Sequence, residues 1–203
     1  ENKFAGHASA DWTAAIDDLQ ASLPNVHTVL LVVGWFGDDL RAGSCTVRPK
    51  VEVAEKITTP NAWMVHGITR NIAAVVSTVD GRPAYGGTPS DDSVVRAIRD
   101  LKARGLSVVF YPFLFMDIPS GNTLPDPWTG GTGQPAYPWR GRITCDPAPG
   151  QPDSVDQTAA AAAQVAAFFG TVTRSQINVS VNASTNVVTT VYSGPAEWSY
   201  RRF

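Results

Sequence analysis

Aspartate, arginine and tryptophan side chains gather in two segments of the sequence, and side chains of these types can bind a sugar. The first segment, GWFGDDLRAGSC, covers residues 34–45. Aromatic faces stack on the C–H groups of a sugar ring, while charged groups hydrogen-bond its hydroxyls. We therefore take Trp35, Asp38 and Asp39 as candidate substrate-binding residues. In the structural alternative, the two aspartates are turn or cap residues and Arg41 pairs with one of them.

Asp117 is the single carboxylate in FYPFLFMDIP, residues 110–119. The apolar residues before it are typical of a strand buried in a parallel sheet, and such folds keep their sites where strands end. We therefore predict that Asp117 lies at the carboxyl end of a central strand. There it would accept a hydrogen bond from a sugar hydroxyl or pair with Arg140. A turn residue is the alternative, because Pro119 follows closely.

The segment YPWRGRITCD, residues 137–146, supplies Trp139 and Arg140 as the remaining candidate substrate-binding residues. Trp139 and the nearby Trp128 have an alternative role as packed anchors that keep a long loop ordered. No residue is assigned a catalytic role.

The sequence contains no motif for a metal, a phosphate or an activated nucleophile. His7, His27 and His66 lack the spacing of metal ligands. A Gly-rich phosphate loop, a GxSxG elbow and an HExxH sequence are all absent. We therefore predict neither a metal site nor a cofactor.

Capping residues and apolar spacing predict the helices that must position these residues. The first covers residues 9–23 and carries one apolar stripe: Trp12, Ile16, Leu19 and Leu23. The second covers residues 90–104, with a Ser90 cap, two acids in its first turn and Gly105 as its end. An Ala-rich third helix is expected over residues 154–169.

Two apolar runs, residues 26–37 and 106–116, predict strands that are buried on both faces. Residues 72–79 predict a shorter strand, so the helix over residues 90–104 would connect two parallel strands. The alternation of helices with buried strands indicates an α/β fold, either a barrel or an open doubly wound sheet.

Two further segments depart from this alternation. Residues 117–153 form a connection much longer than the usual loop of about 2–6 residues, and loops of that length are commonly functional. Residues 171–192 alternate polar and β-branched residues around NASTN, which predicts an inserted, exposed hairpin.

The last ten residues, GPAEWSYRRF, predict the start of a helix because Pro195 follows Gly194 at the first helical position. Only three strands precede it, whereas a complete eight-fold barrel takes about 250 residues. We therefore expect residues 1–203 to be a single domain that is cut before it is finished.

Charge and hydropathy narrow the range of partners. The chain of 203 residues has 16 basic and 18 acidic residues, which argues against nucleic acid as a direct partner. Its longest apolar runs fall short of the roughly 20 residues of a membrane-spanning helix, so no membrane anchor is predicted.

Cys45 and Cys145 are too far apart in the sequence for a CxxC pair, which leaves a disulfide or two reduced thiols as the alternatives.

Long segments of the chain carry a resemblance to a known family. They are VVGWFGDDLRAGSCTVRP, DGRPAYGGTPSDDSVVRAIRDLKARGLSVVFYPFLFMDIP, PAYPWRGRITCDPAPG, AAAAAQVAAFFG and GPAEWSYRRF. Together they closely resemble the TIM-barrel-like domain of gene transfer agents and related tailed phages. That domain belongs to a very large tail-tip protein, sometimes called the megatron, and is similar to glycoside hydrolase barrels.

The resemblance implies a (β/α)8 TIM-barrel-like fold, of which this chain is the incomplete N-terminal part. Glycosidases use a pair of carboxyl groups, and in barrels of this kind these usually follow the fourth and seventh strands. Because the chain is expected to stop before the fourth strand, no catalytic residue is carried over. The fragment alone is expected to be inactive, and its residues would at most bind substrate.

The resemblance also implies a function. The first hypothesis is a baseplate component of a phage or gene transfer agent particle that binds or cleaves a cell-envelope polysaccharide during DNA delivery. Its partners would be that polysaccharide and other tail-tip proteins of the virion, at the bacterial cell surface or in the periplasm. The alternatives are a non-catalytic structural or glycan-binding module of the tail tip and a free bacterial glycosidase.

Overall fold

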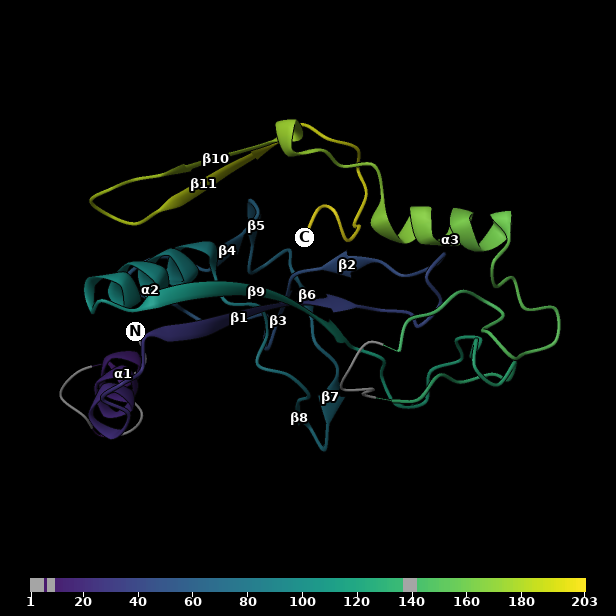
Figure 1. Ribbon diagram of the computed structural model, residues 1–203, viewed down its shortest axis with the longest axis horizontal. Helices are drawn as coiled ribbons and strands as arrows, with labels where there is room; N and C mark the ends of the chain where they lie inside the picture. The colour runs from purple at the N-terminus through teal and green to yellow at the C-terminus, as the bar shows by residue number, and fades with distance from the viewer. Residues whose placement is uncertain (1–5, 7–9, 137–141) are drawn as a thin grey trace.

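A computed structural model describes residues 6, 10–136 and 142–203. Its longest elements are the parallel strands β1 (Thr28–Gly37) and β9 (Ser107–Met116), which run side by side through the middle of the molecule (Figure 1). A short strand, β2 (Val47–Arg48), pairs antiparallel with the end of β1. The resulting sheet has the order β2-β1-β9. The helix over residues 90–104 does connect two parallel strands, but the partner of β9 is β1 and not the strand predicted over residues 72–79.

Two helices pack at the amino ends of the long strands. Helix α1 (Asp11–Ser22) precedes β1, and helix α2 (Asp91–Ala103) precedes β9 as the crossover between the parallel strands. Ser90 caps α2 by accepting a hydrogen bond from the backbone N–H of Ser93. The two helices and the strand starts share a small core: Ile16, Leu19, Val26, Val29, Leu101, Leu106 and Val108. The helices predicted over residues 9–23 and 90–104 are thus confirmed, with shorter bounds.

Between β2 and α2 the chain forms two-residue ladders. They pair β3 (Lys50–Val51) with β6 (Ala74–Val75), β4 (Met64–Val65) with β5 (Ile68–Thr69), and β7 (Thr78–Val79) with β8 (Arg82–Pro83). The single strand predicted over residues 72–79 is therefore wrong. Within residues 72–79, the backbone N–H of Ser77 donates to the carboxylate of Asp117 and not to a neighbouring strand, so the strand pairing is interrupted there.

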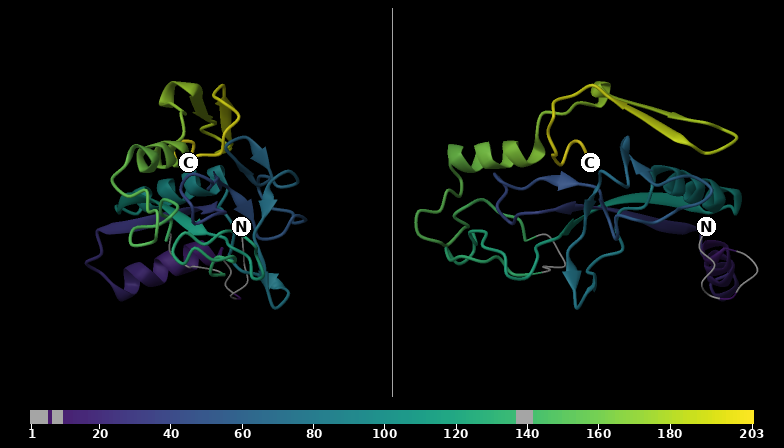
Figure 2. Two further views of the ribbon diagram at one scale, coloured as in Figure 1. Left: turned by 90° about the vertical axis from the view of Figure 1, so that its right-hand side faces the viewer. Right: turned by 180° about the vertical axis from the view of Figure 1, so that it is seen from behind.

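Beyond β9, a long connection leads to α3 (Ala159–Phe169), the short 3-10 helix η1 (Arg174–Gln176) and the hairpin of β10 (Ile177–Val181) and β11 (Val188–Tyr192). The antiparallel hairpin is confirmed, and it extends above α2 in Figures 1 and 2. Helix α3 starts later than predicted, because Thr158 is its cap.

The helix predicted after Gly194 is wrong. The chain there forms bends and turns. Its aromatic side chains pack onto Trp35, with ring centroids 6.1 Å away for Trp198 and 5.1 Å away for Phe203. Packing of these rings therefore overrides the local helix signal of Pro195.

The expected (β/α)8 barrel is also wrong. The described residues form a small mixed α/β protein with three helices and many short strands in small sheets, without a contiguous β/α repeat. A barrel requires a paired strand on both sides of every strand. In the part of the chain that the structure describes, β9 pairs with β1 on one side only. The chain between β1 and α2 is divided into short ladders, so it supplies no further long strand.

Burial changes along the two long strands. Residues 33–37 of β1 are buried, whereas Leu30 and Val32 are 54% and 47% exposed. On β9, Met116 is buried while Val109 and Tyr111 are about half-exposed. The prediction of strands buried on both faces is therefore right for the carboxyl half of β1, but wrong for its amino half and for β9, in which only Met116 is buried.

The main core covers the carboxyl ends of the strands. It joins Trp35 and Met116 to loop and ladder residues: Leu40, Cys45, Val47, Val51, Trp63, Val65 and Ile118. Phe168 of α3 packs against it from outside. The predicted site residues therefore lie beside a packed core.

Candidate functional site

The parallel pairing brings the predicted carboxylates to one edge of the sheet. Asp38 and Asp39 open the loop that follows β1, and Asp117 directly follows β9. The backbone N–H of Asp117 donates to the carbonyl of Gly37 at 2.8 Å, which continues the ladder to the strand ends. Asp117 is thus at the carboxyl end of a parallel strand, as predicted, but β9 is an edge strand of this sheet and not the central strand that was expected.

Asp38 and Asp39 fix the loop after β1. Asp38 accepts hydrogen bonds from the backbone N–H and the hydroxyl of Thr46, at 2.7 and 2.6 Å. Asp39 accepts from the backbone N–H of Arg41 at 2.8 Å and forms an ion pair with its guanidinium at 2.7 Å. These are the contacts of the structural alternative, in which the aspartates are turn residues and Arg41 pairs with one of them.

Gln134 ties this loop to the long connection after β9. Its amide nitrogen donates to Asp39 at 2.7 Å, and its amide oxygen accepts from the backbone N–H of Leu40 at 2.8 Å. Burial disfavours the ionised form of Asp39, but the hydrogen bonds from Arg41 and Gln134 outweigh it and hold the pKa of Asp39 below its usual value. Asp39 is therefore a carboxylate whose acceptor sites are used within the protein.

Asp117 joins three segments of the chain. It is 2% exposed, and its carboxylate forms an ion pair with Lys50 of β3 at 2.7 Å. The same carboxylate accepts from the backbone N–H and the hydroxyl of Ser77. A buried ion pair of this kind makes the structure depend on both partners. Contact of Asp117 with a sugar stays a prediction, and Arg140 lies outside the described residues.

The predicted aromatic residues differ in their surroundings. Trp35 is 5% exposed and its ring lies within the main core. Trp139 lies outside the described residues. The indole N–H of Trp128 donates to the carbonyl of Arg142 at 2.8 Å, and the Arg142 guanidinium lies 5.5 Å from the ring centroid. These contacts fit the role of a loop anchor for Trp128.

Cys45 and Cys145 are both free thiols, so the disulfide considered from the sequence is not formed in this structure. Burial raises the pKa of Cys45 to about 11.

Within the described ranges, histidine, cysteine, aspartate and glutamate side chains form no group of three or more that could hold a metal ion. None of the helices described is long and apolar enough to cross a membrane.

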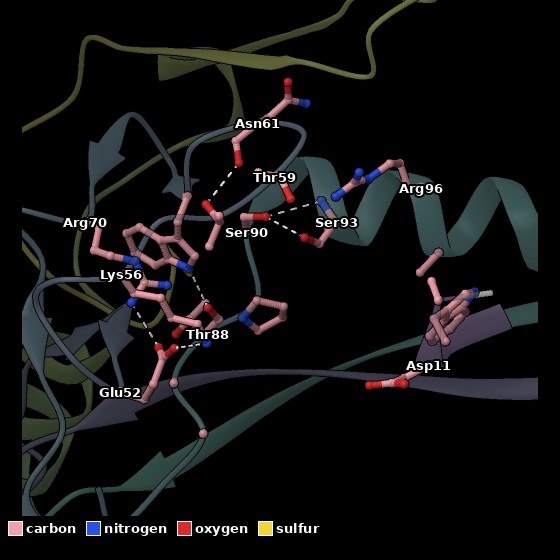
Figure 3. Close-up of a pocket in the computed structure, with 18 of the residues that line it drawn as sticks. Asp11, Glu52, Lys56, Thr59, Asn61, Arg70, Thr88, Ser90, Ser93 and Arg96 are labelled. Carbon is pink, nitrogen blue, oxygen red and sulfur yellow. Dashed lines mark hydrogen bonds and ion pairs between the residues drawn. The ribbon is translucent and has the colours of Figure 1, made fainter. Parts of the chain in front are cut away.

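A cavity of about 890 Å³ lies between α1, the first half of α2 and residues 52–61 (Figure 3). We call it the helix groove. None of the predicted site residues for which the structure gives a position lines it. Hydroxyl and amide side chains line much of it: Thr13, Thr58, Thr59, Asn61, Thr88, Ser90 and Ser93. The groove therefore carries neutral polar side chains, of which Thr88 and Ser90 are buried and bond within the protein.

One end of the helix groove holds a group of paired charges. Glu52 forms ion pairs with Lys56 at 2.7 Å and with Arg70 at 3.1 Å, and the three side chains converge in Figure 3. The Arg70 guanidinium lies 5.5 Å from the ring centroid of Trp63. Burial opposes the ionisation of Glu52, but hydrogen bonds from Lys56 and Arg70 outweigh this effect, so the pKa of Glu52 is lowered. Glu52 is therefore ionised at neutral pH.

The other end of the groove has an aromatic surface. Trp12 of α1 is 38% exposed, and its indole N–H donates to Asp100 of α2 at 2.8 Å. The apolar spacing of the first helix predicts that Trp12 and Leu23 are buried, and that prediction is wrong for both, because Leu23 is 54% exposed. The hydrogen bond to Asp100 holds the ring at the groove instead of in the core.

Sequence reasoning missed the helix groove because its residues come from three segments that are far apart in the chain and form no motif. The signal that could have found it is a pair of hydroxyl-rich turns, TTPN at residues 58–61 and TPS at residues 88–90. Comparison with protein-family models finds no match, and comparison with curated proteins finds none either.

Proposed function

We propose that this chain is a glycan-binding component of the tail tip of a phage or gene transfer agent particle, and that it binds a cell-envelope polysaccharide. The long segments that resemble the tail-tip domain support the tail-tip assignment. Under this proposal the chain acts at the bacterial cell surface or in the periplasm. Its protein partners would be other tail-tip proteins.

One observation supports the glycan part of the proposal. The helix groove combines a partly exposed indole, Trp12, with a row of hydroxyl and amide groups in one open cavity. A sugar needs both features, because its C–H faces stack on aromatic rings and its hydroxyls need fixed polar partners. The ion pairs around Glu52 leave the charged end of the groove without a large net charge.

The carboxylates near the groove favour binding over cleavage. A glycosidase needs one carboxylic acid with a raised pKa opposite a second carboxylate. Three carboxylates line the groove, those of Asp11, Glu52 and Asp100. The pKa of Glu52 is lowered, and Asp100 already accepts from Trp12 and Arg104. Burial raises the pKa of Asp91, but Asp91 accepts from the backbone N–H of His66 and does not line the groove.

Retention of the chain on immobilised envelope polysaccharide tests the proposal. Trp12→Ala should weaken binding about fivefold, because loss of a stacked ring costs on the order of 1 kcal/mol. Trp12→Phe keeps an aromatic ring but loses the hydrogen bond to Asp100 that holds the ring at the groove, so its affinity should lie between those of the wild type and Trp12→Ala.

Tyr111→Ala is the matched control. Tyr111 is 44% exposed on β9, similar to the 38% of Trp12, but it does not line the groove. Its loss should leave polysaccharide retention unchanged. Equal retention of the wild type and Trp12→Ala, or an equal loss in both alanine variants, would contradict the proposed site.

A further inference from the structure

Two arginines lie on the same indole ring where β2 meets the C-terminal segment. The Arg48 guanidinium carbon is 5.6 Å and that of Arg202 is 3.8 Å from the ring centroid of Trp198. Arg202 also lies 4.1 Å from the ring centroid of Tyr192. The aromatic rings therefore hold two cations close together and partly out of water.

Neither arginine has an acidic partner among the described residues. Most ion pairs of the structure involve arginines, including Arg41, Arg70 and Arg104, but none involves Arg48 or Arg202. The hydrogen bonds of the two residues go to neutral groups. Arg48 donates to the hydroxyl of Thr46 at 3.2 Å, and Arg202 donates to the carbonyl of Glu197 at 2.8 Å.

Three buried nitrogen atoms in this region have no hydrogen-bond partner. They are Nε of Arg48, Nε of Arg202 and Nε2 of His66. His66 belongs to the turn between β4 and β5, and its ring lies 5.1 Å from that of Tyr192. Buried polar groups are normally paired, so three unpaired nitrogens around one aromatic group indicate a missing acceptor.

The nearest carboxylates are used elsewhere. Glu197 accepts from the backbone N–H groups of Thr171 and Val172, at 2.6 and 3.1 Å, and from the hydroxyl of Ser199 at 3.0 Å. Asp91 accepts from the backbone N–H of His66 at 2.8 Å. Burial lowers the pKa of Arg202 and the charge of Arg48 lowers it further, while attraction to Tyr192 and Glu197 offsets part of this effect.

We infer that the cluster of Arg48, His66 and Arg202 binds an oxyanion, either a carboxylate or a phosphate group. Guanidinium groups bind both through charge-assisted hydrogen bonds, which gain strength beside aromatic rings that exclude water. The anion would provide an acceptor for the unpaired nitrogens and remove the repulsion between the cations. All three residues are partly exposed, and anion binding requires a small movement of their side chains because the unpaired nitrogens themselves are buried.

This site is separate from the proposed glycan site, because none of the three residues lines the helix groove. The oxyanion could come from a free inorganic ion or from an acidic sugar. Inorganic phosphate and glucuronate are therefore the two probes.

Thermal unfolding of the chain with each probe, at an ionic strength kept constant with NaCl, tests the inference. At about ten times the Kd of the probe, binding should raise the Tm by about 3–5 °C in a saturable way. Arg48→Gln should abolish this rise. Arg142→Gln should keep it, because Arg142 also lies over an indole, that of Trp128, but outside the cluster.

NMR signals of the His66 imidazole provide a second measurement on the wild type, which does not depend on the folding of a variant. They should shift in a saturable way as phosphate or glucuronate is added. A response to either probe supports the inference, and a response to glucuronate alone identifies an acidic sugar as the source. A Tm rise no larger than that with NaCl, an equal rise in Arg48→Gln, or an unchanged His66 signal would overturn it.

Discussion

Charged side chains occur both at the strand ends and in the helix groove, but they differ in how far they are exposed to solvent. Asp39 and Asp117 are 4% and 2% exposed, and their oxygens accept hydrogen bonds from within the protein. In the groove, the Lys56 side chain is 43% exposed and the Trp12 residue 38% exposed. A polar residue at a strand end is therefore not by itself a binding residue. What distinguishes a site is polar and aromatic surface left open to a ligand.

Two ion pairs of equal length allow this comparison to be tested. Lys50 pairs with the buried Asp117, and Lys56 pairs with the partly exposed Glu52, both at 2.7 Å. If the strand-end group is structural, breaking the first pair should matter much more for stability than breaking the second.

Asp117→Ala should have the largest effect. The change leaves the Lys50 ammonium buried without its counterion, and loss of one partner of a buried pair costs about 3–5 kcal/mol. Urea unfolding measures the free energy of unfolding. The double variant Lys50→Met/Asp117→Leu should recover much of the loss, because it removes both charges together. A single variant within about 1 kcal/mol of the wild type would show that the pair is not structural.

Acidification should have the next largest effect, through His66. Burial, assisted by the charge of Arg202, lowers the pKa of His66 to about 4 in the folded protein, against an ordinary value of 6.5. Between these two pH values the unfolded chain binds a proton that the folded chain does not, so stability falls as the pH decreases from 6.5 toward 4. Because His66 is partly exposed, we expect the free energy of unfolding to fall by about 1–2 kcal/mol between pH 7.5 and pH 5.

His66→Phe provides the control for this pH dependence. It keeps a ring against Trp35 and Tyr192 but cannot be protonated. The difference in unfolding free energy between the wild type and His66→Phe should therefore change between pH 7.5 and pH 5. A constant difference would contradict the lowered pKa of His66.

Lys56→Gln should have the smallest effect on stability. Its ion pair with Glu52 is partly exposed to water, and surface pairs contribute about 0–1 kcal/mol. We expect a change of less than about 0.5 kcal/mol in the same urea experiment. A loss similar to that of Asp117→Ala would erase the distinction between the two regions.

Local signals predicted three of the helices and the two long strands well. The Ser90 cap and the acids after it specify the start of α2, and the apolar runs specify β1 and β9. Such features depend on residues close together in the chain. The same reasoning failed for residues 72–79, because the contact between Ser77 and Asp117 joins segments 40 positions apart. It failed after Gly194 because distant aromatic packing decides that segment.

The candidate site was predictable only in part. The strand-end position of Asp117 follows from the strand pattern, but its pairing with Lys50 depends on a ladder residue that carries no motif. The helix groove is formed by side chains from α1, α2 and residues 52–61, so only the three-dimensional arrangement brings them together. The role of Trp12 at the groove was not predicted. Apolar residues spaced along one face of a helix indicate a buried stripe, but the spacing does not show which of them actually contact the core.

An NMR titration of the ¹⁵N-labelled chain with fragments of the envelope polysaccharide tests the central claim most directly. The account predicts that the largest shifts occur at the indole N–H of Trp12 and at the amides of Asn61 and Ser93, which line the groove. The amides of Asp39 and Asp117 should move little. Shifts concentrated at Asp39 and Asp117, or no saturable shift at the groove residues, would contradict it.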